Sequence, residues 1–351
     1  MDVLLLPGDG IGPEIADVTR QTLRCLDQKF KLSLSIQEDV VGFASLAKHG
    51  ASITPDLIER ARNTDLTILG PVDTAAYPPV EQGGLNPSAA FRKQLDLYAN
   101  IRPSRAFDGI HALTPAMDLV IVRENTEGFY ADRTMFAGSG EVMPTEDLAI
   151  AMRKVTRQGS FRVAAVAAKL AAKRRKHLTI VHKANVLKLS DGLFLSEARK
   201  AAAKTGGLTV TDEHVDACAS LLVRTPTDFD VIVTTNMFGD ILSNQAAELA
   251  GGLGLSGSLN AGDDHAIAQA AHGSAPDIAG QNLANPVSLL LSVAMLLDWR
   301  GEQAGRHDLV AASKALNNSI SSLLRHPETR TKDLGGTLGT TEFGDSLCAA
   351  I

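Results

Sequence analysis

The chain has 351 residues, of which 44% are hydrophobic and 21% are charged, so it can bury a sizeable core and has room for two domains. Its net charge of −6 leaves no broad basic surface, which argues against a nucleic acid or an anionic membrane as its main partner. Cys25, Cys218 and Cys348 lie far apart and form no Cys-x-x-Cys pattern, which predicts reduced thiols, no zinc site and a cytoplasmic location. The apolar runs are too short for a signal peptide or a bilayer span.

Five short apolar runs predict β-strands. They are Asp2–Leu6, Leu66–Leu69, Leu119–Val122, Leu178–Val181 and Val231–Thr234. Stretches with helical periodicity separate these runs, and a further apolar run, Val287–Leu297, predicts a core helix after a proline. The alternation predicts an α/β protein with a mostly parallel sheet, helices on both faces and interleaved lobes.

The first predicted strand is joined to the first helix by a glycine-rich turn at Gly8–Gly12. The spacing is G-x-G-x-G, which differs from the G-x-G-x-x-G of a Rossmann turn, and the Lys-Ser/Thr pair of a P-loop is missing. We therefore expect a tight structural turn near a ligand and not a pyrophosphate cradle.

The third predicted strand runs directly into polar residues, Arg123-Glu124-Asn125-Thr126-Glu127, a position where α/β proteins often place working side chains. With Arg92 and Arg102, Arg123 could form a three-arginine pocket for a di- or tricarboxylate. A buried strand followed by a solvated turn explains this segment alone equally well. Beyond it, Gly138–Pro144 could be a hairpin arm or an ordinary surface loop, and a helix is expected from about Glu146.

Two further strand ends carry candidate chemistry. Lys183 follows the fourth strand and could act as a base if it were partly desolvated, although an isolated lysine in such a turn is usually a solvated charge. After the fifth strand, Asp240 and Asn244 fall on one helical face, and with Asp216 they offer hard oxygen ligands for Mg²⁺ or Mn²⁺. Asp240 could equally be a helix N-cap.

A second small-residue loop covers His272–Gly280 and is followed by Asn285-Pro286. Its small residues would let the backbone approach a ligand, and Asp277 could accept hydrogen bonds from ribose hydroxyls. A carboxylate there would repel a 2′-phosphate, which favours NAD over NADP. A Gly/Pro-rich connection without a ligand is the alternative.

Taken together, these segments resemble the β-decarboxylating dehydrogenases, the isocitrate/isopropylmalate dehydrogenase family. The resemblance covers nearly the whole chain and rests on the ordered motifs GDGIGPE (8–14), LDLYANIRP (95–103), VRENTEGFY (122–130), HKANVLK (182–188), TTNMFGDILS (234–243) and HGSAPDIAG with ANP (272–286). It implies a two-domain fold distinct from the Rossmann fold, with residues 1–95 plus 249–351 as a large nucleotide-binding domain and 96–248 as a small domain. It also implies homodimers or higher homo-oligomers with shared active sites.

The resemblance also implies roles for individual residues. The positions that match substrate-binding residues are Ser88, Arg92, Arg102, Arg123 and Asn185, and the catalytic positions are Tyr130 and Lys183. The metal positions are Asp216 from a partner chain, Asp240 and Asn244. The nucleotide-binding positions are His272, Gly273, Ala275, Pro276, Asp277, Ile278 and Asn285. The implied reaction is NAD-dependent oxidation, then decarboxylation, then protonation, with Lys183 taking a proton and Tyr130 giving one. Asn244 departs from the family pattern, which usually has an acid there, and Ala268–Ala271 replace Phe-Glu-Pro-Val.

Substrate choice depends on the segment before Arg92. Isopropylmalate enzymes place leucines there, whereas Asn86 and Ser88 offer the groups that isocitrate enzymes use for the third carboxylate. The expected substrate is therefore isocitrate or a homoisocitrate-like 3-substituted malate. The alternatives are 3-isopropylmalate, then tartrate or D-malate, and, as a different class, a catalytically silent regulatory subunit.

Overall fold

The computed structural model describes residues 1–129 and 140–351 and is built around one ten-stranded sheet. In spatial order its strands are β2 (Ser35–Glu38), β1 (Asp2–Leu6), β3 (Leu66–Leu69), β12 (Ala266–Gln269), β11 (Leu259–Ala261), β4 (Ala99–Arg105), β5 (Asp118–Glu124), β10 (Val231–Thr234), β8 (His177–His182) and β9 (Thr209–His214). The pairings β12–β11, β11–β4 and β4–β5 are antiparallel and the others are parallel. The predicted α/β class with a mostly parallel sheet is confirmed.

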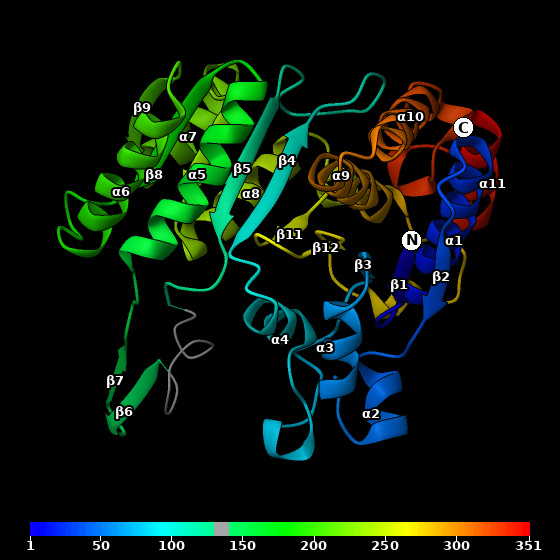
Figure 1. Cartoon of the computed structure of the whole chain (residues 1–351), viewed down its shortest axis with the longest axis horizontal. Coiled ribbons are helices and arrows are strands. Elements are labelled where there is room, and N and C mark those ends of the chain that lie inside the picture. The colour runs from blue at the N-terminus through cyan, green and yellow to red at the C-terminus, as the bar shows by residue number, and fades with distance from the viewer. Residues whose placement is uncertain (130–139) are drawn as a thin grey trace.

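Helices cover both faces of this sheet (Figure 1). They are α1 (Gly12–Phe30), α2 (Phe43–His49), α3 (Pro55–Arg62), α4 (Pro87–Gln94), α5 (Arg157–Lys173), α6 (Ser190–Thr205), α7 (Val215–Arg224), α8 (Asn236–Leu249), α9 (Val287–Ala304), α10 (His307–Leu324) and α11 (Thr340–Ala350). In the described part of the chain, no helix combines the length and the apolar character that a membrane crossing would need.

The strand predictions hold where the chain is apolar. The runs predicted for β1, β3 and β10 match the observed bounds, and those for β5 and β8 are slightly short. Strands β2, β4, β9, β11 and β12 were missed, because they are short or carry polar residues; β4, for example, reads ANIRPSR. The first five strands in spatial order come from residues outside 96–248 and the other five from within it. The domain boundaries themselves stay a prediction.

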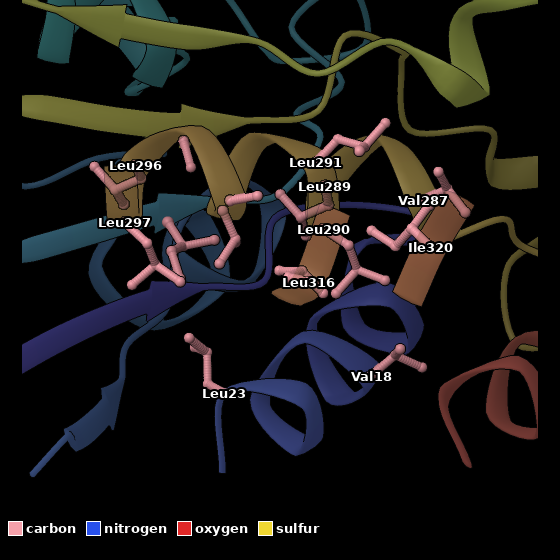
Figure 2. Close-up of a cluster of buried hydrophobic side chains, with 14 of the residues drawn as sticks. Val18, Leu23, Val287, Leu289, Leu290, Leu291, Leu296, Leu297, Leu316 and Ile320 are labelled. Atoms are coloured by element: carbon pink, nitrogen blue, oxygen red, sulfur yellow. The ribbon is translucent and has the colours of Figure 1, made fainter. Parts of the chain in front are cut away.

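Helix α9 is the centre of the largest core cluster, as its apolar run predicts. Side chains such as Leu289, Leu290 and Leu297 are fully buried. Figure 2 shows them between the sheet and the apolar faces of α1 and α10, which contribute Val18 and Leu316 among others. In the other half of the molecule, α5 buries alanines against the sheet and α6, and these small side chains let the elements pack closely.

Residues 140–151 form a hairpin where a helix had been expected. The prediction of a helix from about Glu146 is wrong: β6 (Glu141–Thr145) and β7 (Leu148–Ala151) pair in antiparallel fashion, and α5 begins only at Arg157, capped by Thr156. Every residue of both strands is exposed, and the hairpin projects away from the body (Figure 1). A hairpin arm was one of the two interpretations offered for Gly138–Pro144, but the second strand was missed because Pro144 to Leu148 carries no strong hairpin signal.

The expectation of three reduced thiols is wrong for two of the cysteines. Cys25 on α1 and Cys348 on α11 form a disulfide with a Cα–Cα distance of 5.9 Å, which is an ordinary span for such a bond. The pair is separated by 323 residues, so no local spacing could reveal it. Cys218 is free and buried, and burial raises the pKa of its thiol to about 12. The cytoplasmic location, which rested on reduced cysteines, stays a prediction.

Candidate functional site

A polar pocket of about 250 Å³ opens where β4, β5, β11 and β12 meet helices α4 and α8. Its lining comprises Val72, Thr74, Asn86, Ser88, Arg92, Arg102, Arg123, Asp240, Ser258, Gln269, Ala270, Ala271 and His272. Three guanidinium groups therefore face a cavity that has one carboxylate on its wall. Such an excess of positive charge at a partly buried site favours an anionic ligand. We call this cavity the arginine pocket.

Arg123 is held at the end of β5 by helix α8. Its side chain is 3% exposed, and its Nε and Nη2 atoms donate to Asn236 Oδ1 at 3.0 and 2.6 Å, while Nη1 donates to Asp240. The helix can lie this close because residue 239 is glycine: a Cβ there would come within 2.6 Å of the Cβ of Arg123. The pairing fixes the guanidinium group at the wall of the pocket.

Arg102 reaches the same pocket from β4, the neighbouring antiparallel strand. Its Nη1 donates to Ser243 Oγ at 2.8 Å and lies 3.3 Å from oxygens of both Asp240 and Asn244. Its Nε donates to Asn100 Oδ1 at 2.6 Å. The third arginine, Arg92, comes from α4. The predicted convergence of the three arginines on one cavity is therefore what the fold produces.

Asp240 and Asn244 lie on one face of α8, as their spacing predicts. The alternative of Asp240 as a helix cap is wrong, because α8 begins at Asn236 and Asp240 lies in its second turn. An aspartate and an amide oxygen are ligands that suit a hard cation such as Mg²⁺. Within the described residues no three His, Cys, Asp or Glu side chains gather as a metal cluster.

Lys183, Asp216 and Asn185 lie outside the arginine pocket. The Lys183 ammonium group donates to the Asp216 carboxylate, and this bond holds the pKa of that carboxyl below its usual value. Lys183 is 25% exposed in its side chain and Asp216 69%, and Asn185 is also exposed. We call the ion pair of Lys183 and Asp216 the lysine corner. Tyr130, the predicted proton donor, lies outside the described residues.

The lysine corner rests on a buried ion pair that sequence reasoning missed. The carboxylate of Asp191, which is fully buried, accepts from the backbone N–H of Lys183 at 2.6 Å and is paired with Arg153. Arg153 also donates to Thr235 Oγ1 at 2.9 Å and lies over the ring of Phe238. A signal was available, since Asp191 falls in the first turn of a helix that begins shortly after the strand end.

The predicted nucleotide loop packs on the glycine-rich turn. Ser274 O accepts from Ile11 N at 2.8 Å, and Gly10 is required because a Cβ there would lie 2.0 Å from that oxygen. The side chain of Asp9 accepts from the backbone N–H groups of Phe43 and Asp73 at 2.8 and 2.9 Å. The G-x-G-x-G segment is thus a tight structural turn beside the loop, as expected.

His272 connects the nucleotide loop to the arginine pocket, which it lines. Burial lowers the pKa of its imidazole, and its Nε2 is buried without a hydrogen-bond partner among the described residues. An orphaned polar atom at this position fits a ligand that supplies the missing partner. Asn285 Oδ1 accepts from Val287 N, at the start of α9, at 3.0 Å, and Asn285 Nδ2 donates to Asp333 at 2.9 Å, a carboxylate that was not predicted from the sequence.

The rest of the loop is small or exposed. Gly273, Pro276 and Asp277 are exposed, and Ala275 and Ile278 are half-buried. Nothing lies within 4 Å of a Cβ built on Gly273, so the backbone there is open to a bound molecule. The substrate-binding and nucleotide-binding predictions therefore meet at one place, the edge of the pocket formed by His272.

Comparisons with known proteins agree with this geometry. The family model described as isocitrate/isopropylmalate dehydrogenase matches residues 2–347. The 3-isopropylmalate dehydrogenase of Saccharolobus solfataricus is 38% identical over 98% of both chains. The homoisocitrate dehydrogenase of Methanocaldococcus jannaschii is 39% identical over 99% of this chain and 96% of its own.

A solved structure shows the same architecture. The isocitrate dehydrogenase from Methylococcus capsulatus superimposes with a TM-score of 0.87 at 34% identity and covers 99% of this chain and 98% of its own. The fold resemblance predicted from the ordered motifs is confirmed. The chain belongs to the isocitrate/isopropylmalate dehydrogenase family.

Proposed function

We propose that this oxidoreductase catalyses the NAD-dependent oxidative decarboxylation of a (2R)-malate with a carboxylated substituent at C3, of the isocitrate or homoisocitrate type. The arginine pocket carries the proposal: Arg92, Arg102 and Arg123 face one cavity that His272 joins to the nucleotide loop. Guanidinium groups bind carboxylates in a planar, two-pronged manner, so this pocket suits a substrate with several carboxylates.

The wall of the pocket favours a polar substituent on C3. Asn86 and Ser88 stand on this wall, where a pocket for an alkyl group would need apolar side chains. 3-Isopropylmalate is the first alternative, because relatives of that name match the chain as well as the homoisocitrate enzyme does. Tartrate and D-malate are the next alternative substrates, and they would leave part of the polar wall without a contact.

The cofactors proposed are NAD and Mg²⁺ or Mn²⁺. The nicotinamide would serve as hydride acceptor and the cation would stabilise negative charge on substrate oxygens. Asp240 and Asn244 would hold the cation, together with an aspartate corresponding to Asp216. Asp277 would face the ribose, where its charge disfavours a 2′-phosphate. Lys183 would take the substrate hydroxyl proton and Tyr130 would protonate C3.

We further propose a homodimer in which each active site draws on both chains. The lysine corner does not line the pocket of its own chain. Val186 and Leu189, which follow Lys183 in the chain, are 65% and 90% exposed, and Ile241 on α8 is 57% exposed. Exposed apolar side chains that cluster on one face usually mark an interface. A second copy could cover this face and contact the exposed β6–β7 hairpin. In such a dimer, Lys183 and Asp216 of one chain would lie beside the arginine pocket of the other.

The test is NADH formation by the purified chain with NAD⁺ and Mg²⁺ or Mn²⁺. Isocitrate, homoisocitrate, 3-isopropylmalate, D-malate and tartrate would be offered in parallel, with NADP⁺ as the control cofactor. We expect the two carboxylated substrates to give the highest kcat/KM with NAD⁺. Preference for 3-isopropylmalate would overturn the substrate assignment and leave the reaction class intact. Silence on all five would favour a regulatory subunit that needs a catalytic partner.

A further inference from the structure

Arg153 contacts residues that follow three adjacent parallel strands of the sheet, β5, β10 and β8. It lies between β7 and α5 in the chain, and its side chain is 9% exposed. Its guanidinium group contacts Phe129 after β5 and Thr235 after β10. It is also paired with Asp191, whose carboxylate holds the backbone of Lys183 after β8. One side chain therefore reaches three strand ends at the edge of the sheet where α/β proteins place their reacting groups.

At the end of β8, Arg153 holds the carboxylate that fixes the turn of Lys183. Asp191 is fully buried, and a buried carboxylate is costly unless it is paired. Arg153 pairs with one of its oxygens, and the other accepts from Lys183 N at 2.6 Å. The N–H groups of Val186 and Leu187 donate to the carbonyl of Lys183 at 3.0 and 2.8 Å and close the turn. The position of this turn on the sheet thus depends on Arg153.

At the end of β10, Arg153 holds the start of helix α8. Its Nη2 donates at 2.9 Å to Oγ1 of Thr235, the residue that precedes the helix. Its guanidinium carbon lies 5.2 Å from the centre of the ring of Phe238, in the first turn of α8. A cation at this distance from an aromatic ring is attracted to it. Since α8 also carries Asp240, the guanidinium group connects the turn at residues 183–187 to the helix that lines the arginine pocket.

At the end of β5, Arg153 and its neighbour hold the segment that leads to Tyr130. Lys154 N donates to Gly128 O at 3.1 Å, and Gly128 N donates to Lys154 O at 2.8 Å, which makes a short antiparallel bridge. The guanidinium carbon of Arg153 lies 5.9 Å from the centre of the Phe129 ring. Tyr130 is the next residue in the chain. The proposed proton donor therefore follows directly on a residue that Arg153 contacts.

We propose that Arg153 is a positioning residue that fixes the segments carrying Lys183 and Tyr130 to each other and to α8. The inference rests on the proposed function for the roles of these two groups. Arg153 is not among the described residues that line the arginine pocket, so it should act on proton transfer more than on substrate binding. Its planar group can pair with a carboxylate, donate to a hydroxyl and pack on rings at the same time, which a lysine does only in part.

The experiment measures kcat and KM of Arg153→Met and Arg153→Lys on the substrate that the wild-type enzyme uses best. We expect Arg153→Met to lower kcat about 10-fold to 100-fold, the usual effect of removing a group that orients a reacting one. KM should change less than about 3-fold, because the pocket arginines keep their own bonds. Arg153→Lys should lie between Arg153→Met and the wild-type enzyme in kcat.

Arg174→Met is the matched control, because it also removes the arginine partner of a buried aspartate. Arg174 Nε donates at 2.7 Å to Asp230, which is 1% exposed and precedes β10 at the opposite end of that strand. Both variants should lower the Tm, and only Arg153→Met should lower kcat at a temperature where both are folded. An equal loss of kcat in the two variants, or an unchanged kcat in Arg153→Met, would overturn the proposal.

A double variant keeps the test decisive if Arg153→Met does not fold. Arg153→Met combined with Asp191→Asn removes both charges of the buried pair and keeps an oxygen that can accept from Lys183 N. It should therefore recover stability and still have a lowered kcat, since nothing then connects the turn of Lys183 to Thr235 through a guanidinium group. A wild-type kcat in the double variant would reduce Arg153 to a purely structural role and contradict the inference.

Hydrogen exchange tests the positioning without turnover, so a wild-type chain that is silent on all substrates would contradict the proposed function alone. The readout is amide exchange, measured by mass spectrometry, in peptides that span residues 181–189. We expect Arg153→Met to make exchange in this turn at least about 10-fold faster, and Arg174→Met to leave it unchanged. Equal exchange in Arg153→Met and the wild-type protein would show that Arg153 does not hold the turn.

Discussion

The arginine pocket and the lysine corner are built in opposite ways. In the pocket, Arg102 and Arg123 are nearly buried; Arg102 bonds Asn100 on β4 and Ser243 on α8, and Arg123 bonds Asn236 and Asp240 on α8. In the lysine corner, the charged ends of Lys183 and Asp216 pair with each other at the surface, beside exposed apolar side chains. Under the proposed function, substrate binding would be organised within one chain, whereas the acid–base chemistry would need a second.

The largest effect should come from removing the proposed base. Lys183→Met should lower kcat by about 10²-fold to 10⁴-fold, the usual contribution of a general acid or base. Substrate affinity, measured by calorimetry, should change much less, because the three arginines and not Lys183 are proposed to hold the substrate carboxylates. A variant that lost affinity and kept its kcat would place Lys183 among the binding groups.

Mixed dimers, assayed at a substrate concentration well below the KM of Arg123→Met, should recover activity that both parent variants have largely lost. When Arg123→Met and Lys183→Met chains are co-expressed and pair at random, each mixed dimer should combine an intact pocket with an intact lysine corner at one of its two sites. Random pairing predicts roughly a quarter of the wild-type activity in the mixture. If each site were complete within one chain, the mixture would stay as inactive as its components.

Arg123→Met by itself should act mainly on binding. Loss of a charged hydrogen-bonding group costs about 1.5–3 kcal/mol, which corresponds to a dissociation constant raised about 10-fold to 150-fold. Arg105→Met is a matched control, because Arg105 is an exposed arginine at the end of β4 that contacts Phe107 and Ser321 outside the pocket. Similar affinities for the two variants would refute the binding role of Arg123.

Reduction of the Cys25–Cys348 disulfide should lower stability and leave the pocket unaffected. The bond closes a very long loop, and such bonds contribute about 2–4 kcal/mol to the free energy of unfolding. We expect a reductant to lower the Tm of the wild-type protein and of Cys218→Ser, and to have no effect on Cys25→Ser. Substrate affinity should be equal in the oxidised and reduced states, and a change would connect α11 to the site.

The smallest effect concerns the titration of Asp216. Its pKa is lowered by the bond from Lys183, so the pairing is present above the ordinary pKa of aspartate and is lost as the pH falls through the lowered value. Carbon NMR of the carboxyl group should report a higher pKa in Lys183→Met than in the wild-type protein. Equal values would mean that the pair does not persist in solution.

The sequence predicted the site better at strand ends than in the loops between them. Arg123 and Asp240 were found because each follows an apolar strand, and residues after parallel strands gather at one edge of a sheet. Glu124 and Glu127 in the same polar segment proved structural: Glu124 accepts from Thr126 N at 2.7 Å and Glu127 from Thr156 N at 2.8 Å. Composition cannot distinguish these two uses of a charged residue.

The residues that were missed are those whose partners are distant in the chain. Gln269 was noted only as part of an altered segment, yet it contacts Ser88, 181 positions away. Asp333 bonds Asn285 and Asp191 holds Lys183, and neither belongs to a motif that stood out by itself. A hydrogen bond between distant segments depends on which strands become neighbours, and β11 and β12 were not predicted at all.

The sequence by itself determined the α/β class, the central strands, the core helix α9 and the arginines, because apolar periodicity and strand-end polarity are local properties. The tertiary structure decided the hairpin at residues 141–151, the disulfide between the two terminal helices and the hydrogen bond between Gln269 and Ser88. Each of these depends on the approach of groups that are far apart in sequence or on a turn without a strong local signal. Their geometry is set only when the sheet brings the two halves of the chain together.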